Sequence, residues 1–213
     1  EFNLTNLYKV FETLVRYFEE KIEADAALKN YVFNKVRILN GGLTEWKNNK
    51  GELSTGIKVY KTSLFKFLPK NSMALYINLD SIKANANTNS NVVILDTRTK
   101  DEYTGKRKKN GAYRAGHIPN SILIDWANAI DYDGTKKFKP YNELLELYKL
   151  NGITKEKNIY VYCHSGVRSA HTTFVLTELL GYKNVKNFDG SWIEWSYNKD
   201  LPITQDSITT IFK

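Results

Sequence analysis

Short apolar runs alternate with helical patterns over the second half of the chain. "NVVILDTR", "SILIDW", "NIYVYC" and "VKNF" have the composition of strands. "YNELLELYKLNG" places Leu144, Leu147 and Tyr148 on one helical face and ends at Gly152. "SAHTTFVLTELLGY" predicts a second helix, with a serine at its N-cap and a glycine at its end. Such alternation predicts an α/β fold with a parallel sheet covered by helices on both faces.

The composition limits the classes of protein that remain. With 213 residues, of which 42% are hydrophobic, the chain can bury one full core and part of a second. It shows neither an apolar run long enough for a membrane span nor a signal peptide, which favours a cytoplasmic location. The formal charge of +8 fits a nucleic acid, a membrane surface or small anions as partners, or only a solvated Lys-rich surface. We favour the solvated surface and expect neither nucleic acid nor membrane as a partner.

Cys163 is the single cysteine of the chain. One thiol excludes an internal disulfide and a multi-cysteine zinc site, and three scattered histidines make no metal cluster. We therefore expect no metal and no organic cofactor. The thiol is then either a buried apolar filler or a reagent.

The position of Cys163 favours a reactive thiol. It is the first residue after the strand "IYVY", and the carboxyl ends of parallel strands hold the ligand sites of such sheets. The loop "CHSGVR" that follows must curl over a helix N-terminus, whose free N–H groups favour an anion. Gly166 lets the amides turn inward, and Arg168 adds a permanent positive charge. All these features stabilise a thiolate.

Two segments far apart in the chain are alike. "VRILNGGLTEW" and "VKNFDGSWIEW" align without a gap and share Val, Gly, Glu and Trp, with Asn40 facing Asp189. Chance similarity of two short segments is the alternative. A duplication predicts a helix around Val10 to Phe18, a strand at Val36 to Leu39 and a helix near Leu43 to Trp46, with Gly41 at the same turn as Gly190.

The chain resembles the rhodanese-like sulfurtransferases, specifically the two-domain thiosulfate and 3-mercaptopyruvate sulfurtransferases. The resemblance rests on "VVILDTRTKDEYTG", "RAGHIPNSI", "YVYCHSGVRSAHTTFVLTELLGY" and "VKNFDGSWIEW". It implies tandem rhodanese domains, the first incomplete at its N-terminus. On this interpretation residues 1–50 end an inactive first domain, residues 51–72 connect the domains, and residues 73–213 form the catalytic domain. A second chain that completes the first domain is then a candidate partner.

The same resemblance implies a chemistry. Related phosphatases have five residues between cysteine and arginine, whereas four separate Cys163 from Arg168, the spacing of sulfur transfer. Cys163 would take the sulfane sulfur of thiosulfate as a persulfide and pass it to cyanide or a cellular thiol. The alternatives are a 3-mercaptopyruvate sulfurtransferase and a sulfur-carrier or binding module with little turnover.

The resemblance also assigns residues to the site. Cys163 and Arg168 are expected to be catalytic. His164 and Ser165 occupy loop positions that set donor preference in the family, although solvation of the loop explains them equally well. Asp96 and Arg98 either support the site or form a structural ion pair. The expected substrate-binding residues are His164, Ser165, Gly166, Val167, Ser169 and Arg114.

Glu102 and the two remaining histidines bear on donor preference and on the structure around the site. Glu102 stands near the place where mercaptopyruvate enzymes usually have an arginine, which favours thiosulfate as donor. We expect His117 to be a hydrogen-bonded structural histidine and His171 to face its own helix. The run "GKRKKNGAYR" either concentrates anions or forms a solvated loop.

Overall fold

The computed structural model describes residues 37–56, 59, 75–85 and 91–206. The chain divides into two compact units, residues 74–129 with 139–213 and residues 1–73 with 130–138. Among the described residues, no helix is long and apolar enough to cross a membrane.

The larger unit is built on a parallel sheet. Its strands are β1 (Val92–Asp96), β2 (Ile122–Leu123), β3 (Asn158–Tyr162) and β4 (Val185–Asn187), in the order β2-β1-β3-β4. The register places Asp96 beside Tyr162, so β1 and β3 end together. This confirms the α/β class, the parallel sheet and the four strands expected from the sequence.

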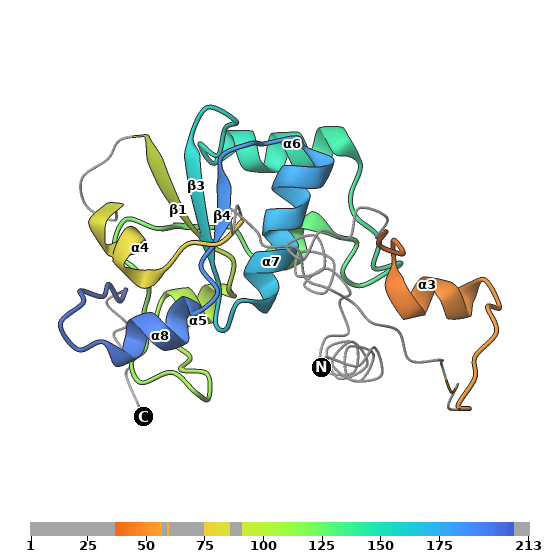
Figure 1. The fold of residues 1–213 in the computed structure, drawn as a ribbon, viewed down its shortest axis with the longest axis horizontal. Coiled ribbons are helices and arrows are strands. Elements are labelled where there is room, and N and C mark those ends of the chain that lie inside the picture. The colour runs from red at the N-terminus through yellow and green to blue at the C-terminus, as the bar shows by residue number, and fades with distance from the viewer. Residues whose placement is uncertain (1–36, 57–58, 60–74, 86–90, 207–213) are drawn as a thin grey trace, which may run out of the picture. The chain divides into compact units, whose positions relative to one another are not determined.

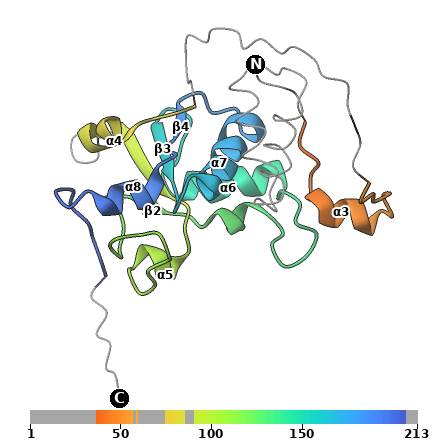
Figure 2. The same ribbon diagram turned by 60° about the horizontal axis from the view of Figure 1, so that its bottom comes forward.

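Helices cover both faces of this sheet (Figures 1 and 2). One face carries α4 (Leu79–Asn85) and α8 (Ser191–Tyr197), and the other carries α6 (Tyr141–Leu150) and α7 (Val167–Phe174). A short helix, α5 (Lys100–Tyr103), follows β1, and the 3₁₀ helix η1 (Trp126–Ala129) follows β2. Because side chains alternate along a strand, Ile94 and Tyr162 join the core under α4 and α8, whereas Leu95 and Val161 are buried on the opposite face.

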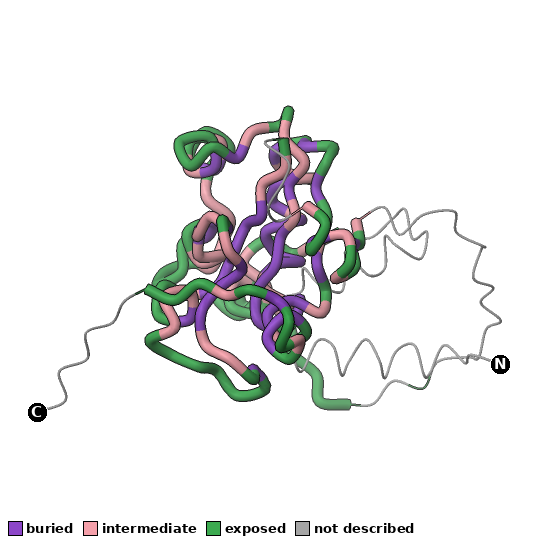
Figure 3. The backbone as a smooth tube through the Cα atoms, turned by 90° about the vertical axis from the view of Figure 1, so that its left-hand side faces the viewer, coloured by how far each residue is buried: buried purple, intermediate pink, exposed green. Residues whose placement is uncertain are grey.

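The buried residues follow the strands and the inner sides of the helices (Figure 3). The core under α4 and α8 consists of Ile77, Ile82, Ile94, Ala112, Ile118, Tyr162, Phe188, Trp192, Trp195 and Leu201. The two tryptophans anchor α8, which matters for the site because this helix starts directly beside the Cys163 loop.

Two single bridges extend the pairing beyond the strands. Tyr76 pairs in parallel with Asn187 of β4, and His117 pairs antiparallel with Thr204. Segments before β1 and after α8 are thereby hydrogen-bonded into the same unit.

The helix after Cys163 differs from the prediction at both ends. It begins at Val167, and its N-cap residue is Gly166 instead of the predicted serine. The N-cap residue has a φ of 92°, which glycine adopts readily and serine rarely does. Beyond Phe174 it continues as a π-helical turn, η2 (Val175–Leu179). Gly181 then takes a φ of 72°, so the predicted C-terminal glycine is confirmed.

The smaller unit contains α3 (Gly42–Asn48), which confirms the helix predicted near Leu43 to Trp46. Its Glu45 pairs with Lys137 at 2.6 Å. The predicted strand is absent from the three of its residues that the structure describes, 37–39, which are irregular; Val36 and the helix predicted around Val10 lie outside the described residues.

Gly41 and Gly190 each precede a seven-residue helix, α3 and α8. Their conformations differ, with φ of 83° at Gly41 and −60° at Gly190. Both glycines thus stand at equivalent places, but the turns are not the same. The duplication and the domain boundaries drawn from it stay predictions.

Candidate active site

Cys163 lies at the carboxyl end of the parallel sheet, where the site was expected. It directly follows β3 and stands four residues before the start of α7. The loop between them turns at Gly166, where a Cβ atom would lie 2.5 Å from Asp189 Oδ1 and 2.9 Å from its carbonyl oxygen. A glycine is therefore required at this position. The first amides of α7 have no carbonyl partner within the helix and surround the loop.

The N-terminus of α8 holds the loop in place. Ser191 Oγ accepts hydrogen bonds from the amides of Cys163 and Gly166, both at 3.1 Å, and donates to Phe188 O at 2.7 Å. The next two amides of α8, Trp192 and Ile193, donate to the carbonyls of Cys163 and His164, both at 3.0 Å. Ser191 itself has a φ of 49°, an uncommon value for a residue other than glycine. Hydrogen bonds from the start of α8 thus fix the backbone of the Cys163 loop.

Two hydroxyls lie near the sulfur. Ser169 Oγ is 3.5 Å and Ser191 Oγ is 4.0 Å from Cys163 Sγ. Ser169 Oγ is also 2.8 Å from Gly166 O, so its single proton has a choice between the carbonyl oxygen and the sulfur. A negative charge on Sγ would attract these protons. Cys163 as a whole is only 1% exposed.

Arg168 is held by Glu102 of α5. Its Nη1 and Nη2 donate to the two carboxylate oxygens at 2.7 and 2.8 Å, a bidentate pair. Glu102 also accepts from Arg107 Nη2 at 3.1 Å and from the Thr99 hydroxyl at 3.0 Å. The positive charge that the loop brings is therefore matched by a carboxylate.

This pair changes the titration of both partners. Burial alone would raise the pKa of Glu102, but the hydrogen bonds and charge of Arg168 outweigh it and hold that pKa well below its usual range. Burial opposes the charge of Arg168, yet its hydrogen bonds to Glu102 and the negative charges nearby raise the pKa of the guanidinium. Both groups are charged at neutral pH.

The side chain of His164 is buried and hydrogen-bonded, so it is not a solvated loop residue. Its Nε2 is 2.8 Å from Asn110 O, so Nε2 carries the proton, and Nδ1 is left as an acceptor. Among the described residues Nδ1 has no hydrogen-bond partner, although it is buried. Burial lowers the pKa of His164, which keeps the ring neutral at pH 7. Ser165, at the tip of the loop, is exposed.

Asp96 and Arg98 form a buried ion pair at the end of β1. Arg98 Nη2 is 2.6 Å from Asp96 Oδ2 and donates to Gly116 O at 2.8 Å. The guanidinium carbon lies 4.6 Å from the centre of the Trp192 ring, the residue after Ser191. The structural ion pair is therefore confirmed, and its contact with Trp192 places it beside the start of α8. Its support of the site stays a prediction.

Arg114 is not brought to the loop. Its guanidinium donates to four carbonyl oxygens around the end of α8, those of Trp195, Ser196, Asn198 and Leu201. These contacts place Arg114 as a clamp on α8 and give no support to an anion contact.

The two remaining histidines are structural. His117 stacks on Tyr103 with ring centres 3.6 Å apart and bonds to its carbonyl through Nδ1 at 2.7 Å, as expected. His171 does not face its own helix. Its ring packs edge-on against Trp126 of η1, at 5.2 Å between centres.

The structure therefore gathers most of the predicted site. The residues that share the loop and the first turn of α7 are Cys163, His164, Ser165, Gly166, Val167, Arg168 and Ser169. Two functional residues were not foreseen, Glu102 as the partner of Arg168 and Ser191 as the anchor of the loop. Within the described part of the chain, no three His, Cys, Asp or Glu side chains form a group that could hold a metal ion.

The fold and this loop define the class of protein. The family model of the rhodanese-like domain matches residues 78–198, more than half of the chain. The chain belongs to the rhodanese-like domain family, which confirms the resemblance to rhodanese-like sulfurtransferases.

Two curated relatives are each 38% identical to the chain. They are the "Sulfur carrier protein TtuD" of Thermus thermophilus, over 80% of this chain and 61% of that protein, and the "Putative thiosulfate sulfurtransferase" of Mycobacterium leprae, over 82% and 63%. The chain thus spans about three fifths of the length of these relatives. Since one rhodanese-like domain is matched, the tandem arrangement is not shown.

Solved structures show the same fold. The anaerobic ergothioneine biosynthesis enzyme from Chlorobium limicola superposes with a TM-score of 0.79 at 24% identity. The match covers 87% of this chain and 45% of that one. At this identity the comparison concerns the fold alone.

Proposed function

We propose that the protein transfers sulfane sulfur from thiosulfate to a thiophilic acceptor through a persulfide on Cys163. The observation that carries this proposal is the geometry of the loop. The thiol of Cys163 lies directly after β3, at the start of the loop that leads into α7. Two hydroxyls lie within 4.0 Å of its sulfur, and Arg168 lies in the first turn of α7. The relatives named for thiosulfate and for sulfur carriage support the same chemistry.

The first half-reaction breaks the S–S bond of the donor. The Cys163 thiolate attacks the outer sulfur of thiosulfate, sulfite leaves with the bonding electron pair, and the enzyme keeps the sulfur as a persulfide anion. The free amides of the loop and of the first turn of α7 stabilise this anion, together with the Ser169 hydroxyl. The Gly166 amide takes no part, because Ser191 already accepts its hydrogen bond.

The second half-reaction restores the thiolate. Cyanide or the thiolate of a cellular thiol attacks the outer sulfur of the persulfide, and the Cys163 sulfur leaves as the thiolate. No redox partner is needed, because the sulfur is exchanged between nucleophiles without net oxidation. The residues of this site supply every group that these two steps use.

A second candidate function is sulfur carriage with little turnover. The specific observation is that Glu102 matches the charge of Arg168, so the loop offers a dianion such as thiosulfate less net attraction than Arg168 alone would. A relative named as a sulfur carrier supports this candidate. The third alternative, 3-mercaptopyruvate as donor, differs only in the leaving group, which is pyruvate.

Mass spectrometry of the intact chain after thiosulfate treatment tests the shared step. We expect a gain of one sulfur atom that maps to Cys163 and disappears on adding cyanide. Turnover of thiosulfate with cyanide then distinguishes an enzyme from a carrier, and kcat/KM measured for both donors identifies the donor. We expect the higher kcat/KM with thiosulfate; no gain of sulfur from either donor would reject sulfur transfer altogether.

A further inference from the structure

Four consecutive cationic side chains follow α5. The proposed reaction involves only Arg107, through the Glu102 carboxylate that it shares with Arg168. Lys106, Arg107, Lys108 and Lys109 are all exposed. Lys106 is 3.9 Å from Asp101, a weak pair between exposed groups, and Arg107 pairs with Glu102, which also serves Arg168. Cations therefore outnumber carboxylates here, and the surface is electropositive.

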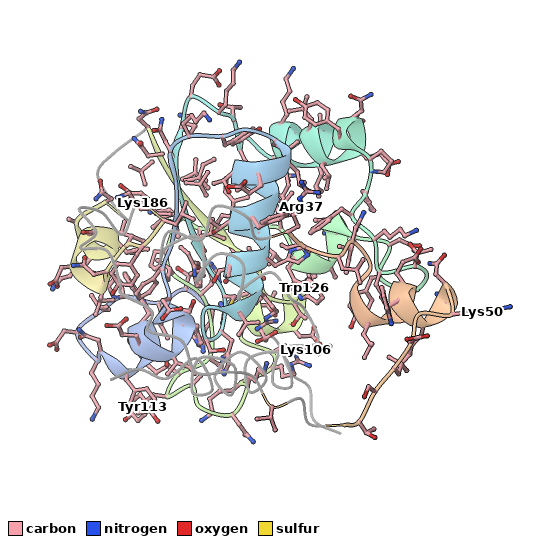
Figure 4. All side chains as sticks on the ribbon, turned by 45° about the vertical axis from the view of Figure 1, so that its right-hand side comes forward. Arg37, Lys50, Lys106, Tyr113, Trp126 and Lys186 are labelled. Atoms are coloured by element: carbon pink, nitrogen blue, oxygen red, sulfur yellow. The ribbon has the colours of Figure 1, made fainter. Side chains whose placement is uncertain are left out.

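Two exposed aromatic rings lie at the end of α8. Tyr113 is 47% and Tyr197 59% exposed, and their ring centres lie 5.6 Å apart. Lys199 Nζ lies 5.4 Å from the centre of the Tyr113 ring. Figure 4 shows Lys106 and Tyr113 in the lower part of the larger unit, apart from each other, with Lys186 above them. Tyrosine and arginine are enriched at protein interfaces, whereas lysine is depleted, so the lysines contribute electrostatic attraction and the tyrosines contribute contact area. We call residues 106–109, Tyr113, Tyr197 and Lys199 the basic aromatic surface.

Two contacts connect this surface to the Cys163 loop. The carbonyl of Asn110, directly after the cations, is 2.8 Å from His164 Nε2. Arg107 shares the Glu102 carboxylate with Arg168. A molecule bound to the basic aromatic surface would therefore lie beside the loop that carries the sulfur.

We propose that the basic aromatic surface docks an acidic protein that receives sulfur from Cys163 through its own thiol. This inference rests on the proposed function and adds the class of acceptor. A protein is favoured over a nucleic acid because the proposed cellular acceptor is a thiol, and cysteine supplies a thiol whereas unmodified RNA and DNA do not. In the transfer, the acceptor thiolate bonds to the outer persulfide sulfur, the S–S bond to Cys163 breaks, and Cys163 leaves as a thiolate.

The test compares short peptides that each carry one cysteine, placed among glutamates, lysines or neutral residues. The full chain is first loaded with thiosulfate, and sulfur transfer to each peptide is followed by mass spectrometry. The charge-reversal variant is Lys106→Glu with Lys108→Glu. The matched control, Lys183→Glu with Lys186→Glu, makes the same change in charge on exposed residues at and before the start of β4.

We expect the wild type to transfer sulfur to the acidic peptide about tenfold faster than to the lysine peptide at low salt, with the difference fading as salt rises. The charge-reversal variant should lose this preference, whereas the control variant keeps it. Persulfide formation and turnover with cyanide should stay unchanged in both variants at high salt, where the attraction of small anions is screened.

Three results would overturn the proposal. They are equal rates with acidic and lysine peptides in the wild type, an equal loss in both variants, and tighter binding of single-stranded oligouridine than of the acidic peptide. Failure of the proposed function itself looks different, because the chain would then gain no sulfur from thiosulfate before any peptide is added.

Discussion

Glu102 binds Arg168 through two hydrogen bonds of 2.7 and 2.8 Å, although 66 residues separate them in the sequence. The carboxylate comes from the first turn after β1, and the guanidinium comes from the first turn after β3. Since β1 and β3 are neighbours and end in register, the two helix starts meet above the same edge of the sheet. The pair fixes the arginine of the Cys163 loop to the rest of the domain.

Glu102→Gln should separate the loop from α5. The variant leaves Arg168 and Arg107 without their shared carboxylate, and loss of one partner from such a buried pair costs about 3 kcal/mol of the free energy of unfolding. The exposed neighbour Asp101, changed to Asn, is the matched control and should cost less than about 0.5 kcal/mol. Urea denaturation measures both, and equal losses would contradict the role assigned to Glu102.

The same pair predicts a dependence on pH. Because the pKa of Glu102 is lowered in the folded state, its contribution to stability is complete above the unfolded pKa of about 4.3 and is lost as the pH falls further. The free energy of unfolding of the wild type should therefore decline more steeply below about pH 4 than that of Glu102→Gln. Parallel curves would show that the carboxylate is not charged in the folded protein.

Ser191→Ala should disable the loop without emptying the site. The variant leaves the amides of Cys163 and Gly166 unpaired in a buried place, at a cost of about 1–3 kcal/mol. Ser196→Ala is the control on the same helix, since its hydroxyl accepts from the Tyr113 amide and not from the loop. We expect both variants to lose stability but only Ser191→Ala to slow persulfide formation, by about tenfold or more.

Cys163→Ser should abolish persulfide formation and turnover and leave the fold intact. A hydroxyl does not become an anion at neutral pH, and the sequence holds no second thiol. Circular dichroism checks the fold, and mass spectrometry after thiosulfate treatment checks the sulfur. Turnover near that of the wild type would place the chemistry elsewhere.

His171 predicts a second, separate pH effect. Burial lowers the pKa of His171 to about 3, so the ring stays neutral in the folded protein. Between about pH 6.5 and pH 3 the unfolded chain binds a proton that the folded chain does not, and stability falls with pH by up to about 1.4 kcal/mol per unit. Glutamine does not titrate, so the His171→Gln variant does not show this pH-dependent loss of stability.

The stability difference between wild type and His171→Gln should therefore shift toward the variant as the pH falls from 7 to 4. Urea denaturation at several pH values measures it. A constant difference over this range would mean that His171 binds its proton equally in both states.

The sequence was sufficient to place Cys163 between a strand and a helix, but not to identify the residues that contact its loop. Period and composition placed the thiol after a buried strand, and Gly166 and Arg168 identified the loop. Ser191 was missed because its role depends on α8 returning to the end of β3, a contact over 28 residues. Its segment "GSWIEW" belongs to the repeat and to the family resemblance, but neither indicates a contact with the Cys163 loop.

Charge patterns were harder to interpret. Arg114 was expected to bind an anion because it lies in "RAGHIPNSI", a segment of the family resemblance, yet its guanidinium donates to carbonyl oxygens at the end of α8. Thr99 and Glu102 form a capping box at the start of α5, and the same carboxylate also binds Arg168. Glu102 thus has a local contact with Thr99, three residues away, and a distant contact with Arg168 that no local sequence pattern indicates.

The bridges of Tyr76 to Asn187 and of His117 to Thr204 bear on where this domain can be cut. The family match begins at residue 78 and ends at 198, so both bridges depend on residues outside it. A fragment trimmed to the match would expose the outer edge of β4 to pairing with other chains. Expression of the domain alone therefore calls for boundaries that retain residues 75–77 and 201–204.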